Sequence, residues 1–259
     1  MIKEELVDRL LDYFKMEDVG LRYLRIPRSY FEKRLLLRGI INCRYPFDIN
    51  EDILKMEDQL LQLEYSEKEI VDVKDIIPMK GKIGLWKGDI TTLKIQAIVN
   101  AGNSSLLGCF IPNHSCIDNQ IHTYAGMRLR LYCYDMMGGK EESVGCARLT
   151  LGYQLPCDYI IHTVGPVVDG ELEEKEITEL QNCYRASLDL ALKHGIKTVA
   201  FLCISTGMFH FPRREASEIA IKTVSDYLEK YPDSFEKIIF NVYLEEDYEI
   251  YFQQLNMKG

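Results

Sequence analysis

The sequence predicts an α/β layered fold with a largely parallel sheet, preceded by a helical N-terminal extension. From residue 82 onward, short apolar runs typical of strands alternate with longer runs typical of helices, which is the pattern of a parallel α/β sheet. Before that point the apolar residues recur at helical spacing. We therefore expect a helical extension over residues 1–75 and an α/β domain over residues 76–259.

Three amphipathic segments make up the predicted extension. The first helix carries an apolar stripe on one face, formed by Leu6, Leu10, Leu11 and Phe14. The same pattern returns over residues 30–41, and Pro46 ends it. Asp48 or Asn50 can cap a third helix. The charged segment 66–75 then leads into the α/β domain.

The α/β domain is expected to contain six strands with helices between them. Strand-like runs lie at residues 83–86, 97–99, 147–153, 159–164, 197–205 and 237–244. The second run is nearly all apolar, which predicts a central position in the sheet. Helices are expected at residues 117–137, 176–194, 214–229 and 246–255. Ligands of such folds bind beyond the carboxyl ends of strands, and residues 100–116 and 205–212 occupy that position.

Charge and composition argue against several classes of partner and location. The net charge of −9 argues against binding to nucleic acid or to an anionic membrane. No apolar run reaches membrane-span length, and the first residues form an acidic amphipathic segment rather than a signal peptide, so a cytoplasmic location is expected. In that compartment the eight cysteines are expected to be reduced thiols or metal ligands rather than disulfides.

A loop between the second strand and the first helix of this domain places Cys109, His114 and Cys116 within eight residues. Two thiolates and an imidazole form a zinc ligand set, and a site with three protein ligands keeps one position open for chemistry. The cysteines can instead be small buried hydrophobes. A closed structural zinc site is the second alternative, and its fourth ligand would come from Asp118, His122 or Cys133. We favour the open zinc site because ligand type and spacing both fit.

Two other loops carry weaker signals. Residues 205–212 follow an apolar strand and precede a helix, so their backbone N–H groups can face a phosphate, although such junctions are common. Asp89 follows a strand and can accept a hydrogen bond from an exocyclic amine or a ribose hydroxyl, or serve as an ordinary cap. His162 lies within a strand and is expected to be a buried histidine bonded to a neighbour.

A run of basic residues lies in the extension: Arg22, Arg25, Arg28, Lys33, Arg34, Arg38 and Arg44. They can dock an acidic partner or a phosphate. The favoured interpretation is a solvated face that is paired with the acids Glu51, Asp52, Glu57 and Asp58.

Five segments, in order, resemble a macrodomain, the ADP-ribose-binding α/β fold. They are GDIT at 88–91, AIVNAGN at 97–103, IDNQIHTYAG at 117–126, GCARLTLGYQLPCDYIIHTVGP at 145–166 and CISTGMFHFP at 203–212. Each motif is modest alone, whereas five in order are highly specific. The resemblance implies a three-layer α/β/α macrodomain with a mixed, largely parallel central sheet.

One departure from the common family pattern is informative. Where most hydrolytic macrodomains have a glycine-rich run, this chain has CFIPNHSC. This looks like the zinc-dependent macrodomain subgroup, which is often encoded beside a macrodomain-linked sirtuin and a lipoylated carrier protein. The resemblance implies a hydrolase with one Zn2+ per chain that removes mono-ADP-ribose from protein side chains, with an Asp or Glu ester as the expected linkage. The implied partner is an ADP-ribosylated protein, and a lipoylated carrier protein is a candidate.

The resemblance also implies roles for individual residues. Asp89 would hold the adenine amine with the Ile90 amide nearby, and Asn103 would bond the distal ribose. Asp118 matches the acid of the catalytic loop, so Asp118 and Asn103 are the expected catalytic residues. The loop around the diphosphate and the distal ribose would comprise Ser205, Thr206, Gly207, Met208 and Phe209. His210 departs from the small residue that is frequent at its position.

Two alternative functions use the same residues. A non-catalytic ADP-ribose reader would keep Asp89, Asn103 and the phosphate loop, and would use zinc only to shape the site. A metal-dependent phosphoesterase acting on ADP-ribose derivatives would cut at the phosphate instead of the ribose.

Overall fold

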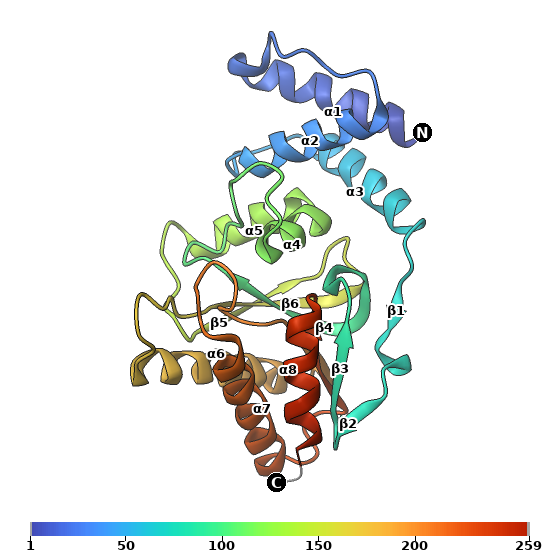
Figure 1. Ribbon diagram of the computed structural model, residues 1–259. Coiled ribbons are helices and arrows are strands. Elements are labelled where there is room, and N and C mark those ends of the chain that lie inside the picture. Colours follow the sequence, from blue (N-terminus) through green and yellow to red (C-terminus); the bar gives the residue numbers. More distant parts are fainter. Residues whose placement is uncertain (1, 258–259) are drawn as a thin grey trace.

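An eight-stranded mixed sheet runs through the larger part of the chain in the computed structural model, which describes residues 2–257 (Figure 1). Seven strands follow the order β2–β3–β8–β7–β4–β6–β5, and β1 (Val71–Asp72) pairs with β4. The bounds are β2 Pro78–Lys80, β3 Ile83–Lys87, β4 Leu93–Gly102, β5 Ala147–Leu151, β6 Cys157–Val164, β7 Thr198–Phe201 and β8 Lys237–Val242. Only the β2–β3 and β5–β6 pairs are antiparallel. The predicted central strand is β4, between β7 and β6, as expected.

Helices cover both faces of this sheet. On one face lie α4 (Ile117–Ala125) and α5 (Met127–Met137), and on the other lie α6 (Glu174–Lys193), α7 (Arg213–Lys230) and α8 (Glu245–Asn256) (Figure 1). Short 3-10 turns occur at Val19–Leu21, Val73–Asp75 and Ile90–Thr92. This arrangement confirms the predicted three-layer α/β/α fold with a mixed, largely parallel sheet.

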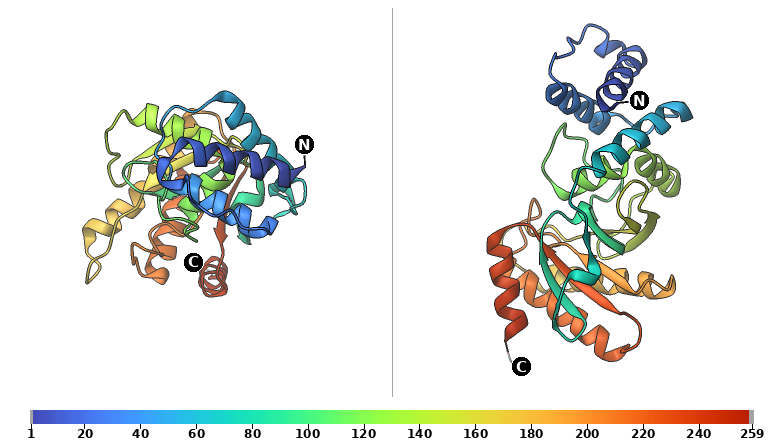
Figure 2. Two further views of the ribbon diagram at one scale, coloured as in Figure 1. Left: turned by 90° about the horizontal axis from the view of Figure 1, so that it is seen from above. Right: turned by 90° about the vertical axis from the view of Figure 1, so that its right-hand side faces the viewer.

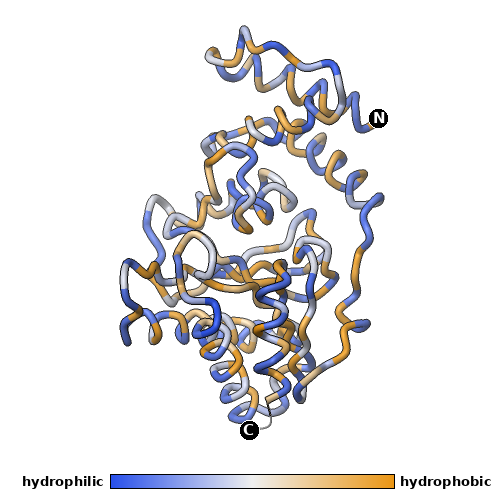
Figure 3. The backbone as a smooth tube through the Cα atoms, in the orientation of Figure 1, coloured by the Kyte–Doolittle hydropathy of each residue, from blue (hydrophilic) through white to orange (hydrophobic). Residues whose placement is uncertain are grey.

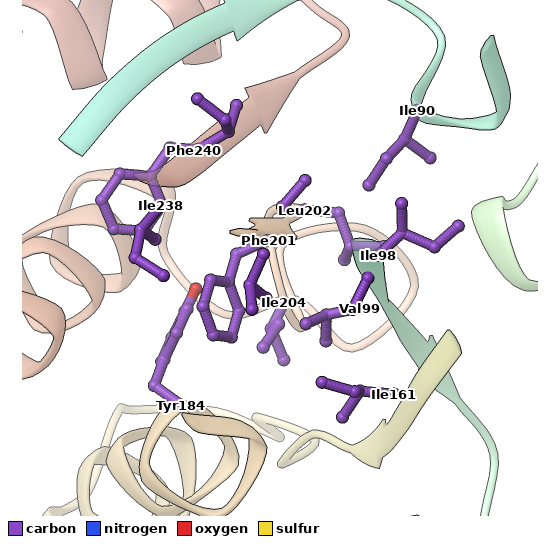
Figure 4. Packing of buried hydrophobic residues seen from close by; sticks show 14 of the residues in the cluster. Ile90, Ile98, Val99, Ile161, Tyr184, Phe201, Leu202, Ile204, Ile238 and Phe240 are labelled. Atoms are coloured by element: carbon purple, nitrogen blue, oxygen red, sulfur yellow. The ribbon is translucent and has the colours of Figure 1, made fainter. Parts of the chain in front are cut away.

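The core forms where the central strands meet the helices. Figure 4 shows Ile98 and Val99 of β4 beside Phe201 of β7 and Phe240 of β8. Tyr184 of α6 packs on Phe201, with ring centroids 5.0 Å apart. All of these side chains are essentially inaccessible to solvent. Burying apolar surface on this scale is the main favourable term in folding, so the sheet provides a rigid base for the loops at its edge.

The secondary structure differs from the sequence prediction in one helix, in two short strands and at the boundary of the extension. The single helix expected over residues 117–137 is two helices, because Gly126 has φ 89°, a conformation that favours glycine and ends α4. The short strands β1 and β2 were missed, since two or three residues are too few to show a period. The segment 71–75, assigned to the extension, includes β1, which pairs with the sheet strand β4.

The extension consists of α1 (Lys3–Glu17), α2 (Tyr30–Cys43) and α3 (Glu51–Tyr65), which lie together at the end of the molecule opposite the C-terminus (Figures 1 and 2). The predicted Asn50 cap is confirmed, because its side chain accepts a hydrogen bond from the Asp52 N–H. The extension has its own apolar core, into which Met127 of α5 also packs. Figure 3 shows the apolar residues of these helices alternating with polar ones along each turn.

The basic run of the extension is paired differently from the prediction. Arg34 bonds Glu64 at 2.6 Å, while Arg44 pairs with Glu17. Of the expected acidic partners, Glu51 and Asp58 bind Arg128 of α5, so the expected pairing was wrong. The reason is tertiary: α3 lies against α5. Within residues 2–257, no helix has both the length and the apolar character needed to cross a membrane.

Candidate active site

A cavity of about 540 Å³ opens beyond the carboxyl ends of β4, β7 and β8. Parallel neighbours end at the same edge of a sheet, which brings loops that are distant in sequence to one place. The predicted site residues in its wall are Asn103, Cys109, His114, Cys116, Asp118, Ser205, Thr206, Gly207, Met208 and Phe209. The structure therefore brings together the two loops that the sequence singled out.

The three predicted zinc ligands are close to one another. The donor atoms of Cys109, His114 and Cys116 all lie within 4.8 Å of one another, and Cys109 Sγ is 3.6 Å from His114 Nδ1. Tetrahedral zinc with a thiolate and an imidazole at their usual bond lengths separates the two donors by about 3.6 Å. The donor set and its spacing thus fit a zinc ion.

The remaining candidates for a fourth ligand lie outside this group. Within the described residues, neither Asp118, His122 nor Cys133 joins the set of mutually close donors. Cys133 is buried in the core of the α/β domain. Three ligands facing a cavity favour the open site over the closed structural one.

Cys116 also begins helix α4. Its Sγ accepts a hydrogen bond from the Asn119 N–H at 3.5 Å, so the thiol takes the place of the usual N-cap oxygen. Burial raises the pKa of the Cys116 thiol, so the thiol is neutral unless a cation stabilises the thiolate. The same sulfur atom therefore serves the helix and is available to a metal.

Asp118 lies two residues farther on and is buried in the cavity wall. Its Oδ1 accepts a hydrogen bond from Asn100 Nδ2 at 2.9 Å and lies 3.7 Å from His122 Nε2. Burial raises the pKa of Asp118 to about 6, against the opposing effect of the Asn100 bond. His162 lies behind this group, fully buried, with Nδ1 3.2 Å from Asn100 and Nε2 3.0 Å from Thr150. The interpretation of His162 as a buried, bonded histidine is confirmed.

The loop after β7 presents its backbone to the cavity. Ser205 and His210 have positive φ values of 65° and 56°, and the Phe211 N–H donates to the Ser205 carbonyl, which closes the loop. Among the described residues, no protein acceptor is found for the N–H groups of residues 206–209. A concave run of free amides is a typical anion site, and α7 begins directly behind it.

Two predicted residues lie outside the cavity wall. Asp89 follows β3, and its carboxylate accepts hydrogen bonds from the Thr91 N–H and the Thr91 hydroxyl at 2.9 and 2.7 Å. The Ile90 side chain is buried in the core. Both stand at the same sheet edge, beside β8, so they lie one strand beyond the cavity. Asn103 is exposed in the wall, with Nδ2 bonded to the Gly108 carbonyl at 3.0 Å.

The cavity also has a wall that the sequence interpretation missed. It is formed after β8 by Tyr243 and Leu244, and by Arg213 and Asp247, which form an ion pair at 2.5 Å. Ligands of α/β sheets bind beyond the carboxyl ends of the strands, and this rule applies to β8 as well as to β4 and β7. Applied to the end of β8, it could have found Tyr243. The contact between Arg213 and Asp247 joins α7 to α8 and has no counterpart in the sequence pattern.

Comparisons with known proteins find relatives along nearly the whole chain. A family model described as the Macro domain matches residues 99–220. A "Protein-ADP-ribose hydrolase" of Treponema medium is 42% identical over 248 residues, which cover 93% of this chain and 95% of that protein. One from Staphylococcus aureus (strain Mu50 / ATCC 700699) is 45% identical over 238 residues, covering 90% and 88%. The Trypanosoma brucei macrodomain in complex with ADP-ribose superposes with a TM-score of 0.65 at 28% identity and covers 92% of this chain and 95% of its own.

Proposed function

The chain belongs to the macrodomain family, and from this premise we propose a zinc-dependent hydrolase that removes mono-ADP-ribose from protein side chains. Hydrolysis of protein-linked ADP-ribose is the activity named for its relatives over nearly their whole length. The requirement for one zinc ion and an Asp or Glu ester as the linkage are our additions. The observation that carries the zinc requirement is the group formed by Cys109, His114 and Cys116 in the wall of the same cavity as Asp118, whereas the ester linkage rests on the resemblance described above.

Substrate binding follows from the loops around the cavity. The free amides of residues 206–209 would donate to the diphosphate, which spreads its negative charge over several fixed dipoles. Asn103, at the end of β4, would bond the distal ribose. Asp89 and the Ile90 amide would reach the adenine from the neighbouring strand end, with Asp89 accepting from the exocyclic amine.

The reacting end of the ADP-ribosyl group would lie between Asp118 and the three metal ligands. A bound zinc ion supplies Lewis acidity there, either orienting a ribose hydroxyl or ester oxygen or lowering the pKa of water. Asp118 would accept a proton from the attacking water, and the Asn100 Nδ2 bond holds its carboxylate in place for that role. Because two thiolates donate much charge, we favour substrate orientation over activation of water.

The identity of the modified protein rests on the resemblance alone. We propose an ADP-ribosylated protein as the partner, with a lipoylated carrier protein from a sirtuin-linked gene cluster as the first candidate. A cytoplasmic location and the lack of nucleic-acid binding remain predictions from composition.

Purified protein incubated with ester-linked and amide-linked ADP-ribosylated substrates, with and without a chelator, tests the proposal. We expect free ADP-ribose from the ester substrate, and its loss when the chelator removes zinc. Binding of ADP-ribose without turnover in either condition would identify a reader. Products cut at the phosphate would identify a phosphoesterase. Full activity in the chelated, zinc-free protein would show that zinc has no catalytic part.

A further inference from the structure

One face of helix α2 in the extension lies directly against the loop that carries Cys109, His114 and Cys116. In Figure 1 this loop rises from the end of β4 to meet α2. The contacts come from Arg38, Gly39 and Asn42. Asn42 lies on the same face as the other two, because residues three and four apart are neighbours on a helix surface. All three are more than 65 residues away from the loop in sequence.

Arg38 makes the most direct of these contacts. Its Nη2 donates to the His114 carbonyl at 3.0 Å and to Asn119 Oδ1 at 2.8 Å. Its Nε is buried and has no hydrogen-bond partner among the described residues. Burying an unpaired donor costs free energy, which the two Nη2 bonds must offset. The guanidinium thus ties the backbone of one metal ligand to the first turn of α4.

Asn119 extends this connection to the other two ligands. It is fully buried, and its Nδ2 donates to the carbonyls of Cys109 and Ile111 at 3.3 and 3.0 Å. Its backbone N–H donates to Cys116 Sγ at 3.5 Å. Arg38 and Asn119 together therefore touch the backbone or side chain of all three ligands.

The far side of the loop is held by the next turn of α2. Asn42 accepts a hydrogen bond from the Asn113 N–H at 3.0 Å and donates to Thr123 Oγ1 at 3.0 Å. Gly39 allows this close approach, because a Cβ there would lie 3.1 Å from Asn113 Nδ2. The extension therefore holds both ends of the turn at residues 112–114.

We propose that Arg38 and Asn119 are positioning residues for the zinc site, so that the extension acts as a brace for metal binding. The inference rests on the proposed zinc function. Groups behind metal ligands orient them and tune their basicity, and losing one such group typically weakens metal affinity 10–100-fold. Without Arg38, Asn119 Oδ1 keeps only the longer bond from the Thr123 hydroxyl at 3.3 Å, and the His114 carbonyl loses its bond to the guanidinium, so the three donors are no longer preset for one ion.

The test compares Arg38→Met with Arg34→Met in the full chain. Arg34 lies one turn earlier on α2 and bonds Glu64. Within residues 2–257 the side-chain hydrogen bonds of Glu64 go to Tyr30 and Arg34, so Arg34→Met should weaken the extension without removing a bond to the metal loop. Zinc affinity is measured by competition with a chromophoric chelator, and the Co2+-substituted proteins are compared by their d–d absorption. We expect Arg38→Met to bind zinc 10–100-fold more weakly with an altered cobalt spectrum, and Arg34→Met to match the wild type within about twofold.

Two further measurements separate the possible results. Arg38→Lys keeps the positive charge but loses the planar set of guanidinium N–H donors, so we expect a zinc affinity between those of the wild type and Arg38→Met. Hydrogen exchange in the metal-free proteins should be faster over residues 109–119 in Arg38→Met only. Equal zinc affinity in Arg38→Met and Arg34→Met would overturn the brace while leaving the zinc proposal intact. A wild-type chain that binds no zinc would overturn both.

Discussion

At the scale of single residues, Cys109, His114 and Cys116 combine two kinds of information. Their residue types and their spacing can be read from the sequence, so a zinc site could be predicted from them. Their mutual distance depends on how the loop between β4 and α4 folds, and the burial of Asp118 against Asn100 depends on α4 packing on β4. The ligand set was therefore predictable, and the surroundings of the acid were not.

Replacing either thiolate ligand should release the metal without unfolding the protein. We expect Cys109→Ser and Cys116→Ser to lose most of the one zinc per chain, because serine is a poor zinc ligand, while the core of this α/β domain remains folded. Elemental analysis with circular dichroism on the same samples measures both. If the two variants keep a full complement of zinc, the site lies elsewhere.

The phosphate loop should be equally sensitive to one added methyl group. A Cβ at Gly165 would lie 2.1 Å from Ser205 Oγ and 2.8 Å from Ile204 Cγ2, so Gly165→Ala must displace these two side chains at the start of the loop after β7. Overpacking of this kind costs about 1–3 kcal/mol of stability, and we expect the displacement to weaken ADP-ribose binding. Calorimetry with ADP-ribose checks this, with zinc content as the control. Unchanged affinity would mean that the loop does not form the diphosphate site.

At the scale of elements, helix α5 depends on the extension for its beginning. Gly126 supplies no side-chain cap, and the Met127 N–H instead donates to Glu57 of α3 at 2.7 Å. A carboxylate at a helix N-terminus is favourable, but this one is fully buried. Burial raises the pKa of Glu57 to about 7, with the Met127 bond opposing it. Glu57 thus links the extension to the α/β domain. Its ionised form is disfavoured by burial, so the free energy of unfolding should depend on pH.

This cost of ionising Glu57 should appear as a pH-dependent stability. Between pH 4.5 and about 7 the folded chain keeps a proton on Glu57 that the unfolded chain has released, so stability falls as pH rises through this range. Relative to Glu57→Gln, which cannot ionise, the wild type should lose about 2 kcal/mol of unfolding free energy between pH 5.5 and pH 8. Denaturant unfolding at the two pH values measures this.

A matched control lies on the same helix. Arg128 lowers the pKa of the exposed Glu51, so Glu51 titrates below this window and Glu51→Gln should have the same effect at both pH values. If Glu57→Gln and the wild type change in parallel with pH, Glu57 is ionised throughout and the proposed cost is absent.

At the scale of the whole molecule, the extension packs against the α/β domain beside the cavity. α2 contacts the loop that carries the proposed metal ligands, whereas α3 caps α5 and pairs with Arg128. Beyond these contacts, the loop between α1 and α2 exposes Arg22, Arg25 and Arg28, which form no ion pair within residues 2–257. The favoured interpretation of the basic run as a paired face therefore fails for these three, and the alternative of an acidic partner remains open.

Charge reversal tests that alternative. We expect Arg25→Glu with Arg28→Glu to slow hydrolysis of an acidic ADP-ribosylated protein, most at low salt, where charge attraction is least screened. Binding of free ADP-ribose and the unfolding temperature should not change. The matched control reverses Arg185 and Lys193, exposed on α6 away from the extension (Figure 1). Equal slowing in both double variants would show an effect of net charge alone, without a docking surface.

The α/β class, the positions of the longer strands and helices, the two loops at the carboxyl edge of the sheet and the three residues proposed to bind zinc could be predicted from the sequence alone. These depend on periodicity and local spacing, which are properties of short segments. The sequence did not determine the break at Gly126 within the helix expected over residues 117–137, because a glycine inside a helical pattern is compatible with continuation.

Which distant residues lie behind the site depends on how the extension and the α/β domain pack together. Arg38 and His114 are 76 positions apart, and Glu57 and Met127 are 70 positions apart. No periodic pattern encodes such pairs, since they exist only when the extension packs against the sheet domain. Asp89 illustrates the same limit: its motif predicted a contact with adenine, and its place one strand beyond the cavity, where it also bonds Thr91, follows from the order of the strands. The residues proposed to carry the chemistry are close together in sequence. The residues that hold them in place are far away in sequence, because burial and hydrogen bonding act between neighbours in space.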